Sequence, residues 1–212
     1  GNPPVRCHCE INYYRVLLFI SATVPFIEIL VGWIFAKSDV VIMDGIHALA
    51  DGSFFAFAYK VTRLVHNKTI PRDDEKRARI RYGRIQLVLL VIGMSVLLFF
   101  EIMYRFDAPP DMHIGFTAFG GMIGLVGALL SYATLRELKK WNPANRTSDV
   151  STIHVWSDIW TSVVPIVTAT LVWIGRRLSI QNITFLDPFF TVLIALYFIA
   201  TSIKYFIYPA KH

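Results

Sequence analysis

The sequence lacks the signals typical of soluble or secreted proteins. Its only cysteines are Cys7 and Cys9, and its apolar residues reach 55% with a mean hydropathy of +0.51, above the roughly 45–50% of soluble domains. We expect no cleavable signal peptide, because the first apolar run is too long and has no small-residue cleavage pattern. No segment has the character of a soluble domain. The net charge of +6 therefore does not indicate nucleic-acid binding, which needs a basic folded surface.

Long apolar runs make up most of the chain. Six runs have about the 20 residues that a helix needs to cross a bilayer: residues 13–36, 40–65, 82–106, 113–138, 150–174 and 186–208. The predicted fold class is all-α, a polytopic membrane protein with a bundle of six transmembrane helices. We expect an N-terminal tail at 1–12, a transmembrane domain at 13–208 and a short C-terminal tail at 209–212, with no cytoplasmic C-terminal domain.

The basic residues predict the orientation of this bundle. Most of the 21 lysines and arginines lie in the tails, in the loop between the second and third runs and in the loop between the fourth and fifth runs. By the positive-inside rule, both termini are cytoplasmic. Cys7 and Cys9 would then lie in a reducing compartment, so we expect no disulfide between them. The predicted location is the plasma (inner) membrane or an organelle membrane.

A short pattern occurs twice in the chain. Residues 44–51 are DGIHALAD and residues 151–158 are STIHVWSD. His47 and Asp51 share one face of a helix, and so do His154 and Asp158, because residues four apart are neighbours there. Asp51 lies roughly 17 Å along the second run and Asp158 roughly 12–17 Å along the fifth, at 1.5 Å per residue. In a hydrocarbon core of about 30 Å, both pairs lie near the midplane on antiparallel helices, where they can meet.

Two imidazoles and two carboxylates form a suitable ligand set for a divalent metal. Zinc takes four nitrogen or oxygen ligands in a tetrahedron, and two carboxylates neutralise its charge in a medium of low dielectric constant. Imidazole exchanges protons near pH 6.5, so protons and metal would compete for the site. The alternative is that these residues only form hydrogen bonds between helices. Two pairs with the same spacing and depth favour the metal site.

These residues resemble those of a known family, the cation diffusion facilitators, over essentially all six runs. The similar segments are 43–51, 153–158 with Thr161 and Ser162, the Tyr82-Gly83-Arg84 start of the third run, and the Leu186-Asp187-Pro188 start of the sixth. The resemblance implies a proton-coupled exporter of divalent cations, usually a homodimer, that works by alternating access. It also implies that His47, Asp51, His154 and Asp158 are the transport-site residues.

The resemblance further implies which metal is carried. With histidine at position 47, the site resembles that of the zinc-selective members, so Zn²⁺ is the expected substrate. Cd²⁺, Co²⁺, Fe²⁺, Mn²⁺ or Ni²⁺ are other candidates. The expected partners are the metal ion, protons, the lipid bilayer and a second copy of the chain, with no cofactor and no nucleic acid. Family members usually carry a cytoplasmic metal-binding domain after the sixth span, whereas this sequence ends at His212.

Several other residues are secondary candidates. Asp44, one turn before His47, could relay protons, could fix the tautomer of His47, or could be solvated near the outer vestibule. Glu28 could line the ion path or serve only in packing. Five further residues carry weaker metal hypotheses. These are the Cys7-His8-Cys9 triplet, which would need an extended backbone, and His66 and Asp73 in the second loop, where Asp73 also suits helix capping.

Gly120 and Gly124 form a small-xxx-small pair in the fourth run, and we interpret them as a site of close helix packing.

Two other functions compete with transport. One is a non-transporting membrane metal-binding partner or sensor. The other is an intramembrane metalloenzyme, which is disfavoured because four protein ligands leave no position for an activated water and the sequence contains no His-Glu-x-x-His pattern. We therefore expect no enzyme activity.

Overall fold

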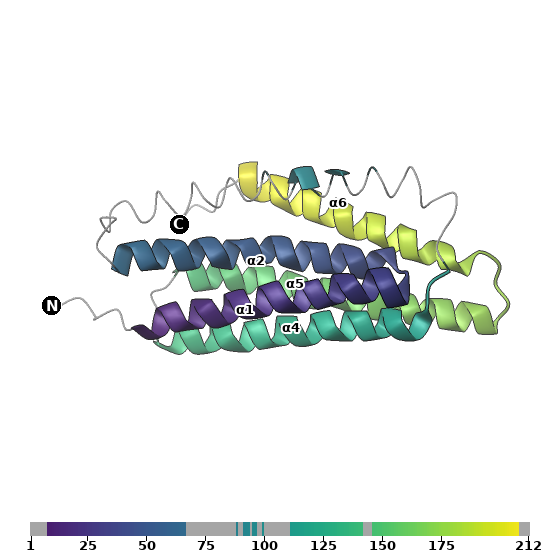
Figure 1. The fold of residues 1–212 in the computed structure, drawn as a ribbon. Helices are drawn as coiled ribbons and strands as arrows, with labels where there is room; N and C mark the ends of the chain where they lie inside the picture. The colour runs from purple at the N-terminus through teal and green to yellow at the C-terminus, as the bar shows by residue number, and fades with distance from the viewer. Residues whose placement is uncertain are drawn as a thin grey trace.

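The computed structural model describes residues 8–66, 111–141 and 146–207, with scattered positions between 88 and 99. The side chains of residues 8–9, 65–66, 146–151, 153–154 and 201–207 lie outside this description. The helices are α1 (His8–Leu30), the π-helix η1 (Val31–Ala36), α2 (Asp39–His66), α4 (Ile114–Trp141), α5 (Arg146–Arg177), the short 3₁₀ helix η2 (Ile183–Phe185) and α6 (Leu186–Ile207). The long helices lie nearly side by side in an elongated bundle (Figure 1).

Five segments of the described chain are long and apolar enough to cross a membrane: Glu10–Ala36, Asp39–Leu64, Ile114–Trp141, Val155–Arg177 and Ile183–Ala200. They match five of the six predicted runs, which confirms an all-α polytopic membrane fold. The remaining run, 82–106, lies largely outside the described residues, and the positions within it that are described are helical.

Three details differ from the sequence-based expectation. The first helix begins at His8 rather than at residue 13, so His8 and Cys9 have helical backbone and not the extended backbone that a Cys-His-Cys metal site would need. This helix also ends as a π-helix, Val31–Ala36, closed by Lys37 in the left-handed region at φ 49°. His66 is the last residue of α2 rather than part of the following loop. Cys7 and Asp73 lie outside the described residues.

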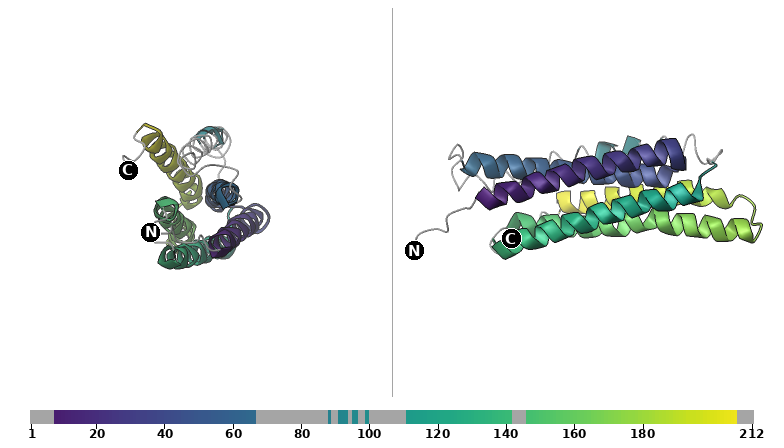
Figure 2. Two further views of the ribbon diagram at one scale, coloured as in Figure 1. Left: turned by 90° about the vertical axis from the view of Figure 1, so that its left-hand side faces the viewer. Right: turned by 60° about the horizontal axis from the view of Figure 1, so that its bottom comes forward.

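Four helices form the compact part of the bundle. α4 packs along α5 and α1, and α1 packs along α2, while α6 lies against α2 and α5; the end view in Figure 2 shows this arrangement. Glycines let α4 approach its neighbours closely. A Cβ atom on Gly121 would lie 3.0 Å from the carbonyl oxygen of Ser162, and one on Gly127 would lie 2.5 Å from Cγ1 of Val24. The packing role expected for the small residues of this helix is therefore visible in the structure.

A buried carboxylate joins the start of α2 to the start of α6. Asp187 accepts a hydrogen bond from the Ser38 hydroxyl at 2.6 Å and another from the Asp39 backbone N–H at 2.8 Å. The first N–H groups of a helix have no partner within the helix, so Asp187 caps α2 from a distant part of the chain. This contact fixes the position of α2, which carries the first copy of the His–Asp pattern.

Two apolar clusters enclose a polar layer in the middle of the bundle. One joins α2 to α6 through residues that include Val41, Met43 and Phe198. The other joins α1, α2, α4 and α5 through residues that include Leu17, Phe55 and Leu135. On α2 the first cluster precedes residue 44 and the second follows residue 54. The His–Asp pattern therefore lies between two apolar layers.

Candidate metal centre

Three of the four repeated His and Asp side chains meet in this polar layer. His47 Nε2 lies 3.3 Å from Asp51 Oδ2 and 3.0 Å from Asp158 Oδ1. Each residue offers one ligand atom, and these atoms all lie within 4.8 Å of one another. The helical geometry of α2 brings His47 beside Asp51, and the packing of α5 against α2 brings Asp158 to both. The cluster could hold a metal ion.

The fourth residue of the set, His154, lies on α5 one turn before Asp158. Its side chain is outside the described part of the structure. The helical backbone still places it on the same side of α5 as Asp158, because residues four apart share a face. Its role as a ligand stays a prediction.

The cluster is almost completely removed from solvent. The exposed side-chain fraction is 3% for His47, 5% for Asp51 and 12% for Asp158. Charged groups in such surroundings cost free energy unless they are paired or bind a metal. Two carboxylates and a neutral imidazole carry a charge that a dication would cancel, so the electrostatics of the cluster favour a divalent cation.

Phe198 of α6 holds the imidazole of His47 from one side. The two rings are stacked, with centroids 3.2 Å apart and an interplanar angle of 16°. This contact restricts the rotation of the His47 ring and so orients Nε2 toward the two carboxylates. Sequence analysis did not single out Phe198, because an aromatic residue within an apolar run has no distinguishing signal.

Asp44 is buried, with 1% of its surface exposed, so the idea that it is solvated near an outer vestibule is wrong. The expected hydrogen bond to His47 is also not observed: within the described residues, His47 Nδ1 has no hydrogen-bond partner. Asp44 instead faces Glu28 of α1 and Thr161 and Ser162 of α5. The remaining secondary candidates, from Cys7 to Cys9, His66 and Asp73, have no described side chains to compare.

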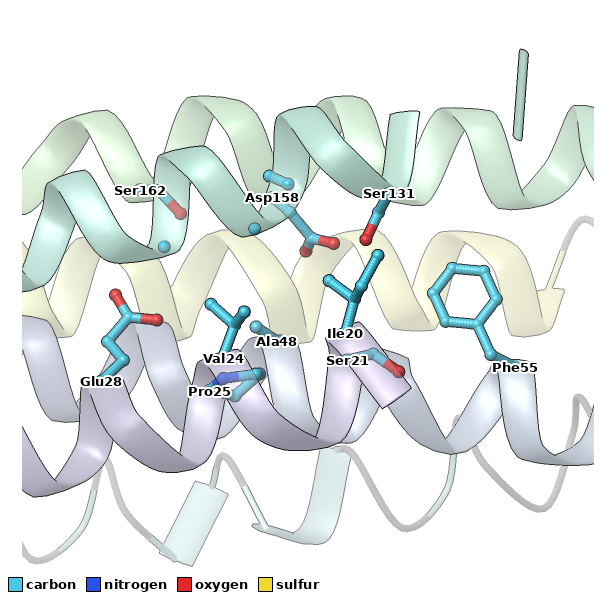
Figure 3. Close-up of a pocket in the computed structure, with 13 residues that line it drawn as sticks. Ile20, Ser21, Val24, Pro25, Glu28, Ala48, Phe55, Ser131, Asp158 and Ser162 are labelled. Carbon is cyan, nitrogen blue, oxygen red and sulfur yellow. The ribbon is translucent and has the colours of Figure 1, made fainter. Parts of the chain in front are cut away.

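A cavity of about 30 Å³ lies beside Asp158. Its lining comes from α1, α2, α4 and α5 and includes Ser21, Glu28, Ser131, Asp158 and Ser162. Figure 3 shows the carboxyl groups of Glu28 and Asp158 on this cavity, together with the Ser131 side chain. A space of this size can hold about one water molecule or small ion. Polar oxygen atoms therefore continue from the His–Asp cluster along the interior of the bundle.

A bundle of membrane-spanning helices with a buried cluster of metal-ligand side chains defines a multi-pass integral membrane protein that could bind metal ions. The family described as "Cation efflux transmembrane domain" matches residues 15–209, and the chain belongs to this family. Its members are transporters and not enzymes, which confirms the expectation that the protein is not an enzyme.

Two curated relatives are also similar in sequence to this chain. The chain is 22% identical over 180 residues to "Metal cation efflux system protein CzcD" of Cupriavidus metallidurans, an alignment that covers 78% of this chain and 54% of the relative. It has the same identity and coverage with "Cation efflux system protein CzcD" of an Alcaligenes species. The chain thus spans about half the length of the curated relatives it matches.

Proposed function

We propose that this chain is the transmembrane transport domain of an exporter of divalent metal cations, with Zn²⁺ as its preferred substrate and protons as the exchanged ions. The observation that carries the proposal is the meeting of His47, Asp51 and Asp158 inside a membrane-spanning bundle, with ligand atoms within 4.8 Å of one another. Ionisable groups at this depth are costly, so a functional role is their expected explanation. Membership of the cation efflux family supports the same conclusion.

The transport site consists of His47, Asp51, His154 and Asp158. Two nitrogen and two oxygen ligands suit the tetrahedral geometry that zinc prefers. Four protein ligands can replace the hydration shell of the ion, and two carboxylates cancel its charge. The ion could therefore enter a medium of low dielectric constant at little electrostatic cost.

Protons drive transport by competing for the same side chains. A protonated imidazole has no free nitrogen lone pair and cannot bind a metal. Since imidazole titrates near pH 6.5, the exchange occurs within the physiological range. With the termini in the cytoplasm, alternating access would release zinc on the other side of the membrane as protons replace it. A homodimer is the proposed assembly, which crosslinking in membranes can test.

Proteoliposome flux measurements test the proposal. Asp51→Ala and Asp158→Ala each remove one ligand and unbalance the charge of the site, so zinc flux driven by an inward proton gradient should be abolished. Asp111→Ala is the matched control, because that carboxylate is exposed and pairs with Arg176 at the end of α5; its flux should stay normal. Normal flux in either buried-site variant would refute the assignment of these residues to the transport site.

Flux and binding together separate the proposed exporter from a metal-binding partner or sensor. If the wild-type chain binds zinc with the ligand dependence above but shows no flux under any proton gradient, the sensor function is the correct one. If the zinc flux is the same with and without a proton gradient, the protein is a uniporter.

A further inference from the structure

Two more carboxyl groups are buried beside the proposed transport site. Glu28 has no exposed surface and Asp44 has 1%, and the two carboxyl groups lie next to each other. Within the described part of the chain, none of their four oxygens makes a hydrogen bond of good geometry, although the Thr161 and Ser162 hydroxyls lie near Asp44. Buried carboxyl groups are normally hydrogen-bonded or paired with a cation. A buried acid pair of this kind must either hold a proton or bind a cation, so it is a candidate for a cation site.

The neighbouring groups supply further oxygen atoms. Ser162 and Thr161 of α5 face Asp44. On α4, a Cβ atom at Gly124 would lie 2.6 Å from Glu28 Oε1 and 2.8 Å from the Ser162 hydroxyl oxygen. The carboxyl of Glu28 and the hydroxyl of Ser162 therefore occupy the space that glycine leaves open, and Figure 3 shows both among the residues that line the cavity.

The cavity connects this group of oxygens to the proposed transport site. Glu28, Ser162 and Asp158 all line the same space of about 30 Å³. A water molecule or small ion in this space would therefore lie between the Glu28 carboxyl and the Asp158 carboxyl.

We propose that Glu28 and Asp44, with the Ser162 hydroxyl, form a second divalent-cation site next to the transport site; this inference rests on the proposed function. Two carboxylates would neutralise a dication here as they do at the transport site. The ligands are all oxygen, whereas the transport site includes imidazole nitrogen. Oxygen ligands suit harder cations, so Mn²⁺ should bind here better than at the histidine-containing site. A cation would bind to Glu28 and Asp44 either before or after it binds at the transport site.

Mn²⁺ binding measured by electron paramagnetic resonance tests the second site. The protein is the 212-residue chain in lipid nanodiscs, with Asp51→Asn and Asp158→Asn introduced together to disable the transport site. We expect one Mn²⁺ per chain to remain bound. Adding Glu28→Gln should weaken that binding by at least about tenfold, the scale on which lost ligand support lowers metal affinity. Glu137→Gln, an exposed carboxylate on α4, is the control and should change nothing.

Two glycine substitutions, one at the site and one as its control, test the same geometry without removing a ligand. Gly124→Ala adds a methyl group against the Glu28 carboxyl and should also weaken Mn²⁺ binding. Gly115→Ala is its control on α4, because a Cβ atom there would meet nothing within 4 Å. If the disabled transport site leaves no bound Mn²⁺, or if Glu28→Gln or Gly124→Ala binds Mn²⁺ as before, the second site is refuted.

A wild-type measurement keeps the test independent of whether the variants fold. With one equivalent of zinc per chain, which the histidine-containing transport site should take up first, the unaltered chain should still bind one Mn²⁺, and its absence would refute the second site. The two proposals fail separately. Normal zinc flux in the wild type and its loss in Asp51→Ala would leave the transport function standing even if no second cation binds.

Discussion

Removing the carboxylate of Asp187 should strongly destabilise the bundle. Asp187→Ala deletes the acceptor of the 2.6 Å bond from Ser38 and of the 2.8 Å bond from the Asp39 N–H. Asp187 and Ser38 have no exposed surface, so water cannot easily replace the lost acceptor. A hydrogen bond to a charged group contributes about 1.5–3 kcal/mol, and two of them give an expected loss of about 3–6 kcal/mol.

Thermal unfolding of the purified chain measures this loss. A change of this size should lower the midpoint by roughly 10 °C in a chain of about 200 residues. Thr191→Val is the matched control: it removes only the bond from the Thr191 hydroxyl to the Asp187 backbone carbonyl, one turn further along α6. We expect that control to cost less than about 1 kcal/mol. If Asp187→Ala unfolds at the same temperature as Thr191→Val, the connection between α2 and α6 does not hold the bundle together.

Three further predictions concern the proposed transport site. His47→Asp replaces a nitrogen ligand with a harder oxygen and adds a negative charge, so larger or harder cations should compete better with zinc; an unchanged ratio of cadmium to zinc uptake would show that His47 does not set selectivity. Zinc affinity should fall as the pH drops below about 6.5, because protonated imidazole cannot bind metal. Calorimetry in buffers of different ionisation enthalpy would contradict this if no protons are released per zinc between pH 6 and 7.5. Phe198→Ala removes the ring that orients His47 and should weaken zinc binding, whereas Leu196→Ala, at an exposed position of the same helix, should not.

The sequence predicted the parts of this protein that depend on local patterns. Apolar runs of membrane-spanning length located five described helices within a few residues of their observed ends, because length and hydropathy act locally along the chain. The repeated His–Asp spacing predicted that α2 and α5 would meet, and the structure brings His47, Asp51 and Asp158 together. The boundaries were less accurate: α1 begins earlier than expected and its last turns form a π-helix, for which the segment 31–36 carries no evident signal.

Contacts between distant residues could not be predicted in this way. Asp187 was noted only as part of a family-like start of the last run, and its partners Ser38 and Asp39 lie about 150 residues away. Which helix end a carboxylate caps depends on the packing of the whole bundle. The same holds for Phe198, whose stacking on His47 requires α6 to lie against α2 at one particular height.

Glu28 shows most clearly what the structure adds to the sequence. As a lone acid in an apolar run, it could have been a packing residue or part of an ion path, and nothing nearby in the chain separates these two. The structure places it beside Asp44 and opposite Gly124, on the cavity that reaches Asp158. A second acid, a hydroxyl group and a small cavity therefore lie close to its carboxyl oxygens, and this favours a role in ion binding. The position of Gly124 thus has two consequences: it lets α4 approach α1 and α5, and it leaves room for a carboxylate that a larger residue would displace.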